Sequence, residues 1–117
     1  MAKEETDIAH NIILDLAPLG VRLFKNVRGL FLTLDGKRKV LAGLQPKGSS
    51  DLIGYTITEI TPDMVGLKLP IFTVIETKTE IGKASDDQNL YLNVIKKHGG
   101  YAGIARNTLD AKKICKK

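Results

Sequence analysis

The residues best suited to chemistry are two acids and a lysine near the middle of the chain. Asp51 opens one apolar run, and a second apolar run ends in Glu76-Thr77-Lys78. The β-branched and aromatic residues of that second run predict a strand over residues 71–78. Because side chains alternate along a strand, Glu76 and Lys78 extend a row of apolar side chains on one face.

Two carboxylates held close together repel each other unless a cation lies between them. Asp51 and Glu76, with the backbone carbonyl of Thr77, would supply the hard oxygen ligands that suit Mg²⁺ or Mn²⁺. Lys78 could then hold a bound water and stabilise developing negative charge, as phosphodiester hydrolysis requires. The alternative, a simple salt bridge between Glu76 and Lys78 on an exposed strand end, stays open.

The elements that would position these residues alternate between helices and strands. Residues Ile8, Ile12, Ile13 and Leu16 predict one buried face on the first helix. The pair Asp35-Gly36 predicts a tight hairpin turn, because it tolerates positive φ at both central residues. The expected elements are a helix over 3–17, a strand over 21–26, a hairpin of 30–34 with 37–41, strands over 51–60 and 71–78, a helix from 85 to 97, a strand over 101–105 and a helix from 108.

Two further polar residues have both a structural and a functional interpretation. Ser85 and Gln88 match a capping box, with Ser85 as the N-cap and Gln88 at the third helical position. Glu4 and Glu5 fall in the first turn of the first helix, where the helix dipole favours negative charge. Glu5 could also reach a metal site if this end of the helix packs beside the sheet.

Cations are dense around the predicted hairpin. Arg22, Lys25, Arg28, Lys37, Arg38 and Lys39 fall within 18 residues. A solvated rim is the simpler interpretation for any one of them. The density is what a surface contacting backbone phosphates needs.

Composition places the chain among ordinary globular proteins. Its 117 residues are enough for one domain, with 43% apolar and 26% charged residues. Lys and Arg number 18 against 13 acids, and the net charge of +5 favours a polyanionic partner. The single Cys115 fits a reducing compartment. Short apolar runs and no match to a signal peptide lead us to expect a cytoplasmic protein.

These residues, taken in order, resemble the PD-(D/E)XK nuclease superfamily, and within it the virus-type replication-repair nuclease (VRR-NUC) domain. Ser50 stands where the superfamily name has proline, and the acid that follows is present. The segments that carry the resemblance are Lys25-Asn26 with Gly29, Gly43-Leu44, residues 48–54, residues 74–78, Gly82, Ser85, Gln88 and residues 99–103.

The resemblance implies an α/β fold with a restriction-endonuclease-like core, a central mixed sheet flanked by helices, over residues 1–117. It implies Asp51, Glu76, Lys78 and Gln88 as catalytic residues and a divalent metal, Mg²⁺ or Mn²⁺. The helix-borne acid of the family best matches Glu5, with Glu4 as the alternative. The expected metal ligands are Asp51, Glu76, Thr77 and Glu5, and the expected DNA contacts are Lys25, Asn26, Arg28, Arg38, Lys39, Lys47 and Lys83.

The implied activity is metal-dependent cleavage of DNA. Small standalone members of the family resemble enzymes that resolve four-way (Holliday) junctions as homodimers, in phage recombination, repair or packaging. Branched DNA and a second copy are therefore the expected partners, with no membrane and no nucleotide cofactor. A flap- or restriction-type nuclease and a non-catalytic DNA-binding module are the alternatives. Apolar residues near Tyr55, Leu67 and Leu69 are candidates for the dimer interface.

Overall fold

A computed structural model describes residues 5–27, 29–44 and 48–117 of the chain. The chain divides into two units, unit 1 (Met1–Thr58) and unit 2 (Glu59–Lys117). Two short 3-10 turns, Ala17–Leu19 and Pro62–Met64, accompany the regular elements. These are α1 (Glu5–Leu16), β1 (Val21–Lys25), β2 (Gly29–Leu32), β3 (Lys39–Ala42) and β4 (Leu52–Thr56) in unit 1, then β5 (Thr73–Thr77), α2 (Asp86–Lys97), β6 (Tyr101–Ala105) and α3 (Thr108–Ile114) in unit 2.

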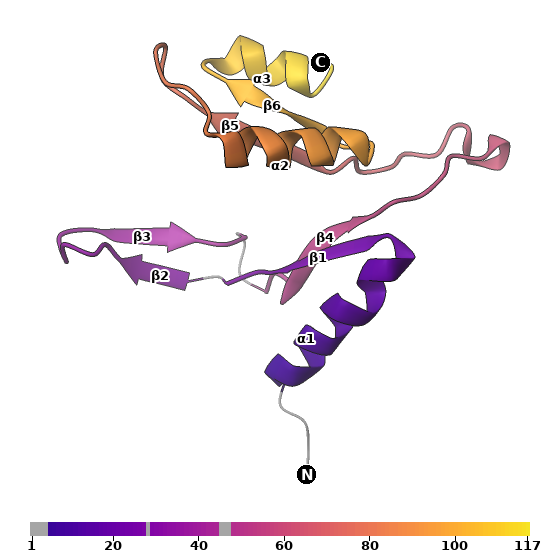
Figure 1. The fold of residues 1–117 in the computed structure, drawn as a ribbon, viewed down its shortest axis with the longest axis horizontal. Helices are drawn as coiled ribbons and strands as arrows, with labels where there is room; N and C mark the ends of the chain where they lie inside the picture. Colours follow the sequence, from indigo (N-terminus) through magenta and orange to yellow (C-terminus); the bar gives the residue numbers. More distant parts are fainter. Residues whose placement is uncertain (1–4, 28, 45–47) are drawn as a thin grey trace. The chain divides into compact units, whose positions relative to one another are not determined.

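In unit 1, β1 and β4 form an antiparallel pair that follows α1 (Figure 1). Gly54 lies in the middle of β4 opposite Leu23. A Cβ atom on Gly54 would lie 1.8 Å from the backbone oxygen of Arg22, far inside van der Waals contact. Only glycine therefore allows the two backbones to approach this closely.

The strand predicted over residues 51–60 is shorter at both ends in the structure. Asp51 precedes β4, and its carbonyl accepts from the N–H of Asn26 at 2.8 Å. At the other end, Ile57 donates to the carbonyl of Gly20 at 2.9 Å, and pairing stops there. It stops because Gly20, with φ of +83°, ends the 3-10 turn that precedes β1, so the chain before it no longer runs beside β4.

The hairpin of β2 and β3 has the register that a turn at Asp35-Gly36 predicts, with Leu32 opposite Lys39. Of the two turn residues, Gly36 adopts positive φ and Asp35 does not. The carboxylate of Asp35 instead accepts from the Thr33 hydroxyl and from the N–H of Lys37, which lowers its pKa from the ordinary value. These bonds make a wider loop than a two-residue turn.

The first helix is confirmed over Glu5–Leu16, but its predicted buried face is not buried. Ile8 is 46% exposed and Ile12 is 38% exposed. None of the described residues of unit 1 is fully buried. Periodicity identifies the apolar face of a helix correctly, but it does not say what covers that face.

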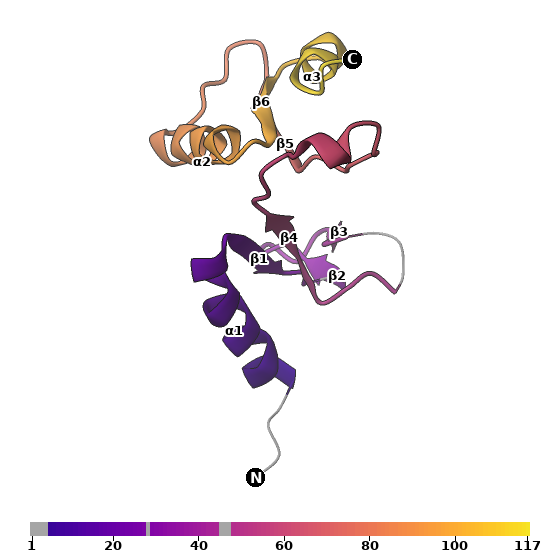
Figure 2. The same cartoon turned by 90° about the vertical axis from the view of Figure 1, so that its right-hand side faces the viewer.

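Unit 2 is a strand–helix–strand crossover followed by a third helix. β5 and β6 are parallel, with Thr73 opposite Tyr101, and α2 connects them. α2 and α3 lie on opposite faces of β6 (Figures 1 and 2). The β6 side chains that pack against these helices are small, so the helices approach the strand closely. The buried residues of this unit are Leu92, Ile95, Ala102 and Ala105.

The described residues thus form a mixed α/β structure with three α-helices and three two-stranded sheets, two antiparallel and one parallel. This confirms the predicted α/β class. The continuous central sheet of a restriction-endonuclease-like core is implied by family resemblance alone. In the described part of the chain, no helix is both long and apolar enough to cross a membrane.

Candidate active site

Glu76 and Lys78 lie at the end of β5, where their side chains share one face. Val74, Glu76 and Lys78 are half-buried, whereas the alternating residues Thr73 and Thr77 are exposed. The predicted alternation along this strand is therefore confirmed. It brings one carboxylate and one ammonium group to the same partly shielded edge of unit 2.

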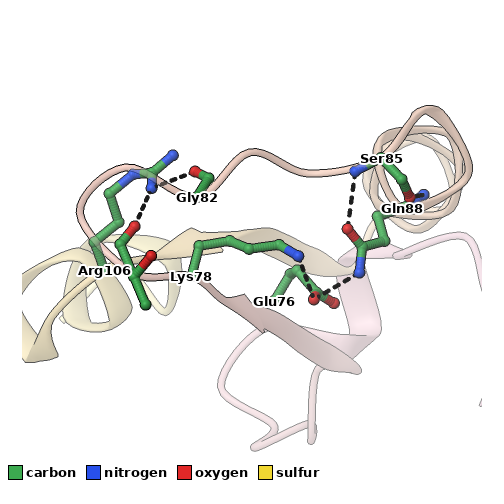
Figure 3. Close-up of polar contacts among 7 residues, drawn as sticks. Glu76, Lys78, Gly82, Ser85, Gln88 and Arg106 are labelled. Atoms are coloured by element: carbon green, nitrogen blue, oxygen red, sulfur yellow. Dashed lines mark hydrogen bonds and ion pairs between the residues drawn. The ribbon is translucent and has the colours of Figure 1, made fainter.

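The side chains of Lys78 and Gln88 meet at one oxygen atom of Glu76 (Figure 3). The Nζ atom of Lys78 lies 3.6 Å from Oε1 of Glu76, and Nε2 of Gln88 donates to the same oxygen at 2.8 Å. The side chains of Lys78 and Glu76 are 22% and 33% exposed. At 3.6 Å the ion pair is too long for a strong hydrogen bond and contributes at most about 1 kcal/mol. Lys78 can therefore turn toward a substrate at little cost.

Gln88 has its predicted capping role and also bonds to Glu76. Its Oε1 accepts from the N–H of Ser85 at 2.9 Å, and the Ser85 hydroxyl accepts from the N–H of Gln88 at 3.1 Å. This reciprocal pair is the capping box that starts α2. The cap fixes the Gln88 amide so that its NH₂ group points at Glu76. The helix start therefore orients a carboxylate on the neighbouring strand.

The carbonyl of Thr77 points away from β6. The N–H of Tyr101 donates to the carbonyl of Phe72, and the N–H of Lys78 donates to the carbonyl of Ala105. The backbone groups of Phe72 and Lys78 therefore face β6. Backbone groups of a strand alternate between its two edges, so Thr77 presents its carbonyl to the other edge of β5. That edge pairs with no strand among the described residues. The role of the Thr77 carbonyl as a metal ligand stays a prediction.

Arg106 is a residue that the sequence analysis missed. One guanidinium nitrogen donates to the carbonyls of Thr79 and Gly82 (Figure 3), with a distance of 2.7 Å to Gly82. Its own N–H donates to the carboxylate of Asp110 at 2.9 Å. Arg106 therefore restrains the loop between Lys78 and Ser85. No local pattern reveals such a bond, because its partners lie 24 or more residues apart.

Asp51 belongs to unit 1, where the side chain of Asn26 organises the loop before it. The Asn26 amide donates to Ser49 Oγ and to the carbonyl of Ser50, both at 3.0 Å. Its Oδ1 accepts from the N–H of Leu44 at 2.8 Å. These bonds engage both ends of the Asn26 amide within the chain. Asn26 therefore holds the backbone next to Asp51, and its predicted DNA contact stays a prediction.

The other predicted site residues are less closely constrained. Glu5 is exposed at the first position of α1, which fits the helix-dipole interpretation, and Glu4 lies outside the described residues. Arg28 and Lys47 also lie outside them. Lys25, Arg38, Lys39 and Lys83 are exposed. In the described residues, no three His, Cys, Asp or Glu side chains gather in a cluster.

The donor set of Glu76 fits a hard divalent cation. Lys78 and Gln88 both approach Oε1, and no described side chain bonds Oε2. A carboxylate oxygen beside a backbone carbonyl is the kind of ligand pair that Mg²⁺ accepts while it keeps several waters. The Gln88 amide orients the Glu76 carboxylate through a hydrogen bond. Residues that hydrogen-bond to metal ligands without touching the metal have this role.

We expect Gln88→Leu to reduce cleavage roughly 10- to 100-fold, as loss of an outer partner of a metal ligand does. The change removes the donor to Glu76 and weakens the helix cap by about 1 kcal/mol. Ser85→Ala is the matched control, since it weakens the same cap but keeps the Gln88 side chain. Metal titrations of kcat for both variants measure the difference. An equal loss of activity in the two would assign Gln88 to the helix cap alone.

Comparison with known protein families identifies the region that contains this cluster. The model of the VRR-NUC domain matches residues 41–108, more than half of the chain. The match includes Asp51, Glu76, Lys78 and Gln88. No curated protein and no solved structure matches the chain. The chain therefore belongs to the VRR-NUC family, which implies a nuclease of the PD-(D/E)XK type, a phosphodiester hydrolase with DNA as its substrate.

Proposed function

We propose that this protein is a Mg²⁺- or Mn²⁺-dependent endonuclease that cuts branched DNA, with four-way junctions as its main substrate. The observation that carries the proposal is the meeting of Lys78 and Gln88 at one oxygen of Glu76, inside the region matched to the family. A merely structural ion pair would not need a third residue, fixed by a helix cap, to hold the carboxylate in place.

The proposed roles follow from chemistry. Asp51 and Glu76 supply the carboxylates for the cation, and the carbonyl of Thr77 adds a neutral ligand. A divalent cation held there would supply a bound water of lowered pKa and would polarise a phosphoryl oxygen. Lys78 orients the attacking water and stabilises the added negative charge. Gln88 positions Glu76, and Glu5 is the proposed supporting acid from α1.

Exposed cations would bind the backbone of the substrate. The proposed contacts in unit 1 are Lys25, Arg38 and Lys39, with Arg28 and Lys47 outside the described residues, and Lys83 in unit 2. Arg38 and Lys39 flank the loop of the β2–β3 hairpin. Within the described residues, neither forms an ion pair with a carboxylate. Their charge is therefore available to phosphates.

We further propose a symmetric homodimer. A four-way junction has paired strands to cut, and a two-fold pair of chains supplies two sites. The apolar surface of the chain supports association, because Leu67 and Leu69 are 61% and 49% exposed. With Tyr55 they stay the proposed interface residues. Light scattering should give twice the mass of one chain.

We expect the purified protein to cut a four-way junction faster than linear, splayed or flap DNA of equal length. The reason is that two sites of a dimer engage two strands of the junction at once. A cleavage assay with Mg²⁺ and with Mn²⁺ on the four substrates measures the preference. Cleavage of flap DNA alone by a monomer would favour the flap nuclease, and binding of junctions without cleavage would favour a DNA-binding module.

A further inference from the structure

The two helices of unit 2 end at the same end of the β5–β6 pair, opposite the end that carries Glu76 and Lys78. α2 and α3 both run antiparallel to β6, so their last turns return to the beginning of that strand (Figures 1 and 2). Six exposed lysines gather on these last turns and the tail, and we call them the lysine cluster: Lys96, Lys97, Lys112, Lys113, Lys116 and Lys117. Among the described residues, none of the six pairs with a carboxylate.

Helix dipoles account for part of this cluster. Lys96 and Lys97 lie in the last turn of α2, and Lys112 and Lys113 lie in the last turn of α3. Cations are favoured at these positions because the C-terminal end of a helix carries partial negative charge. A different explanation is needed for the lysines beyond the helix.

Lys116 occupies a backbone position that favours glycine. It has a φ of +57°, the one positive value among the described residues other than glycine. Lys117 donates to the carbonyl of Lys112 and Lys116 to that of Lys113, which is the Schellman pattern that ends a helix. The end of α2 has the same pattern, with Gly99 in the equivalent place at φ of +95°. The chain thus uses glycine at one helix end and a strained lysine at the other.

The side chain of Lys116 also makes a contact within the chain. Its Nζ atom lies 5.3 Å from the centre of the Tyr101 ring, in a cation–π contact. A pocket of about 370 Å³ lies at this point and is lined by Lys96 and Lys116, with Tyr101 and the glycines of the α2 end. Two lysines therefore border one pocket, whose other lining residues are Gly99, Gly100, Tyr101, Ala102 and Ile114.

We propose that this pocket binds a backbone phosphate of the DNA, so that the lysine cluster forms a second phosphate-binding surface. The inference rests on the proposed nuclease function for the identity of the polyanion. Tyr101 pairs with Thr73, three residues before Glu76 on β5, so the two positions are separated by about 10 Å along the sheet. That distance corresponds to about three base pairs along a duplex. The carboxylate of Glu76 and the lysine cluster are thereby kept apart on unit 2.

The test uses the pocket variant Lys116→Gly, and Lys68→Gln as the control. Both remove one charge from an exposed lysine of unit 2, but Lys68 lies outside the pocket lining. Affinity for a labelled duplex is measured by fluorescence anisotropy in EDTA, over a series of salt concentrations. We expect the pocket variant to lose affinity about tenfold per lost contact and its salt slope to fall by about 0.9 per contact. An affinity equal to that of the control variant would overturn the proposal.

Thermal unfolding of Lys116→Gly separates binding from folding. Glycine removes the strain of positive φ, so we expect its Tm to be equal to or above that of the parent chain. A Tm lowered by more than a few degrees would show that Lys116 serves the helix end, and would overturn the proposal. DNA binding that depends on the pocket, without cleavage in Mg²⁺ or Mn²⁺, would sustain this inference and refute the proposed nuclease activity.

Discussion

Replacing Glu76 by glutamine should reduce DNA cleavage by a factor of about a thousand or more, while DNA affinity stays within about threefold. The loss is large because the carboxylate charge is what holds the cation, and the cation supplies both the nucleophile and charge stabilisation. Glutamine keeps the volume of the side chain and an oxygen for Gln88 to bond. The fold of unit 2 should therefore be unchanged.

The matched control is Glu80→Gln. Glu80 is exposed in the loop just after Lys78, and in the described residues its carboxylate has no bond. Glu80→Gln removes the same charge a few residues away from Glu76. The cleavage rate of this variant should therefore stay within about twofold of that of the parent chain. Single-turnover rates and anisotropy measured on both variants compare chemistry with binding. Equal losses of binding and cleavage in a folded Glu76→Gln protein would contradict the assignment of Glu76 as a metal ligand.

Replacing Gly54 by alanine should destabilise the protein by about 3 kcal/mol or more. The added Cβ would lie 1.8 Å from the oxygen of Arg22 and 2.9 Å from the Cα of Leu23. These are backbone atoms, so neither can move aside without separating β1 from β4. Urea unfolding followed by circular dichroism measures the free energy of unfolding.

Gly29→Ala provides the control for this change. Gly29 begins β2, and its added Cβ would lie 3.4 Å from the Phe31 ring, an ordinary contact. We expect its free energy of unfolding to change by less than about 1 kcal/mol. If Gly54→Ala unfolds at the same urea concentration as Gly29→Ala, the close approach of β1 and β4 is not present in solution. Because β4 follows Asp51 directly, that result would also remove the support for the position of Asp51.

Local patterns in the sequence predicted the parts of the fold that local forces decide. The alternation along residues 71–78 placed Glu76 and Lys78 on one face, and the structure confirms it. The capping box at Ser85 and Gln88 is confirmed in both of its bonds. The helix predicted from residue 108 is confirmed as Thr108–Ile114, with Asn107 as its N-cap.

Long-range hydrogen bonds could not be predicted in this way. The sequence left two interpretations of Gln88 open, cap or site residue. The position of β5 beside α2 brings the capping side chain to Glu76, and its role in the site stays a prediction. Asn26 was predicted to contact DNA because it lies in a basic segment. Its bonds to Ser49 and Ser50 depend on the pairing of β1 with β4. Arg106 has no local signal at all, since it acts on a loop that β5 and β6 bring beside it.

The most direct test of the account is a time course of four-way junction cleavage by the parent chain and by Glu76→Gln, each with Mg²⁺ and with EDTA. We predict that the parent chain cuts the junction in Mg²⁺ only, and that Glu76→Gln binds the junction but leaves it intact in both buffers. Cleavage by the parent chain in EDTA, or cleavage by Glu76→Gln at the parent rate in Mg²⁺, would contradict a metal-dependent site built on Glu76.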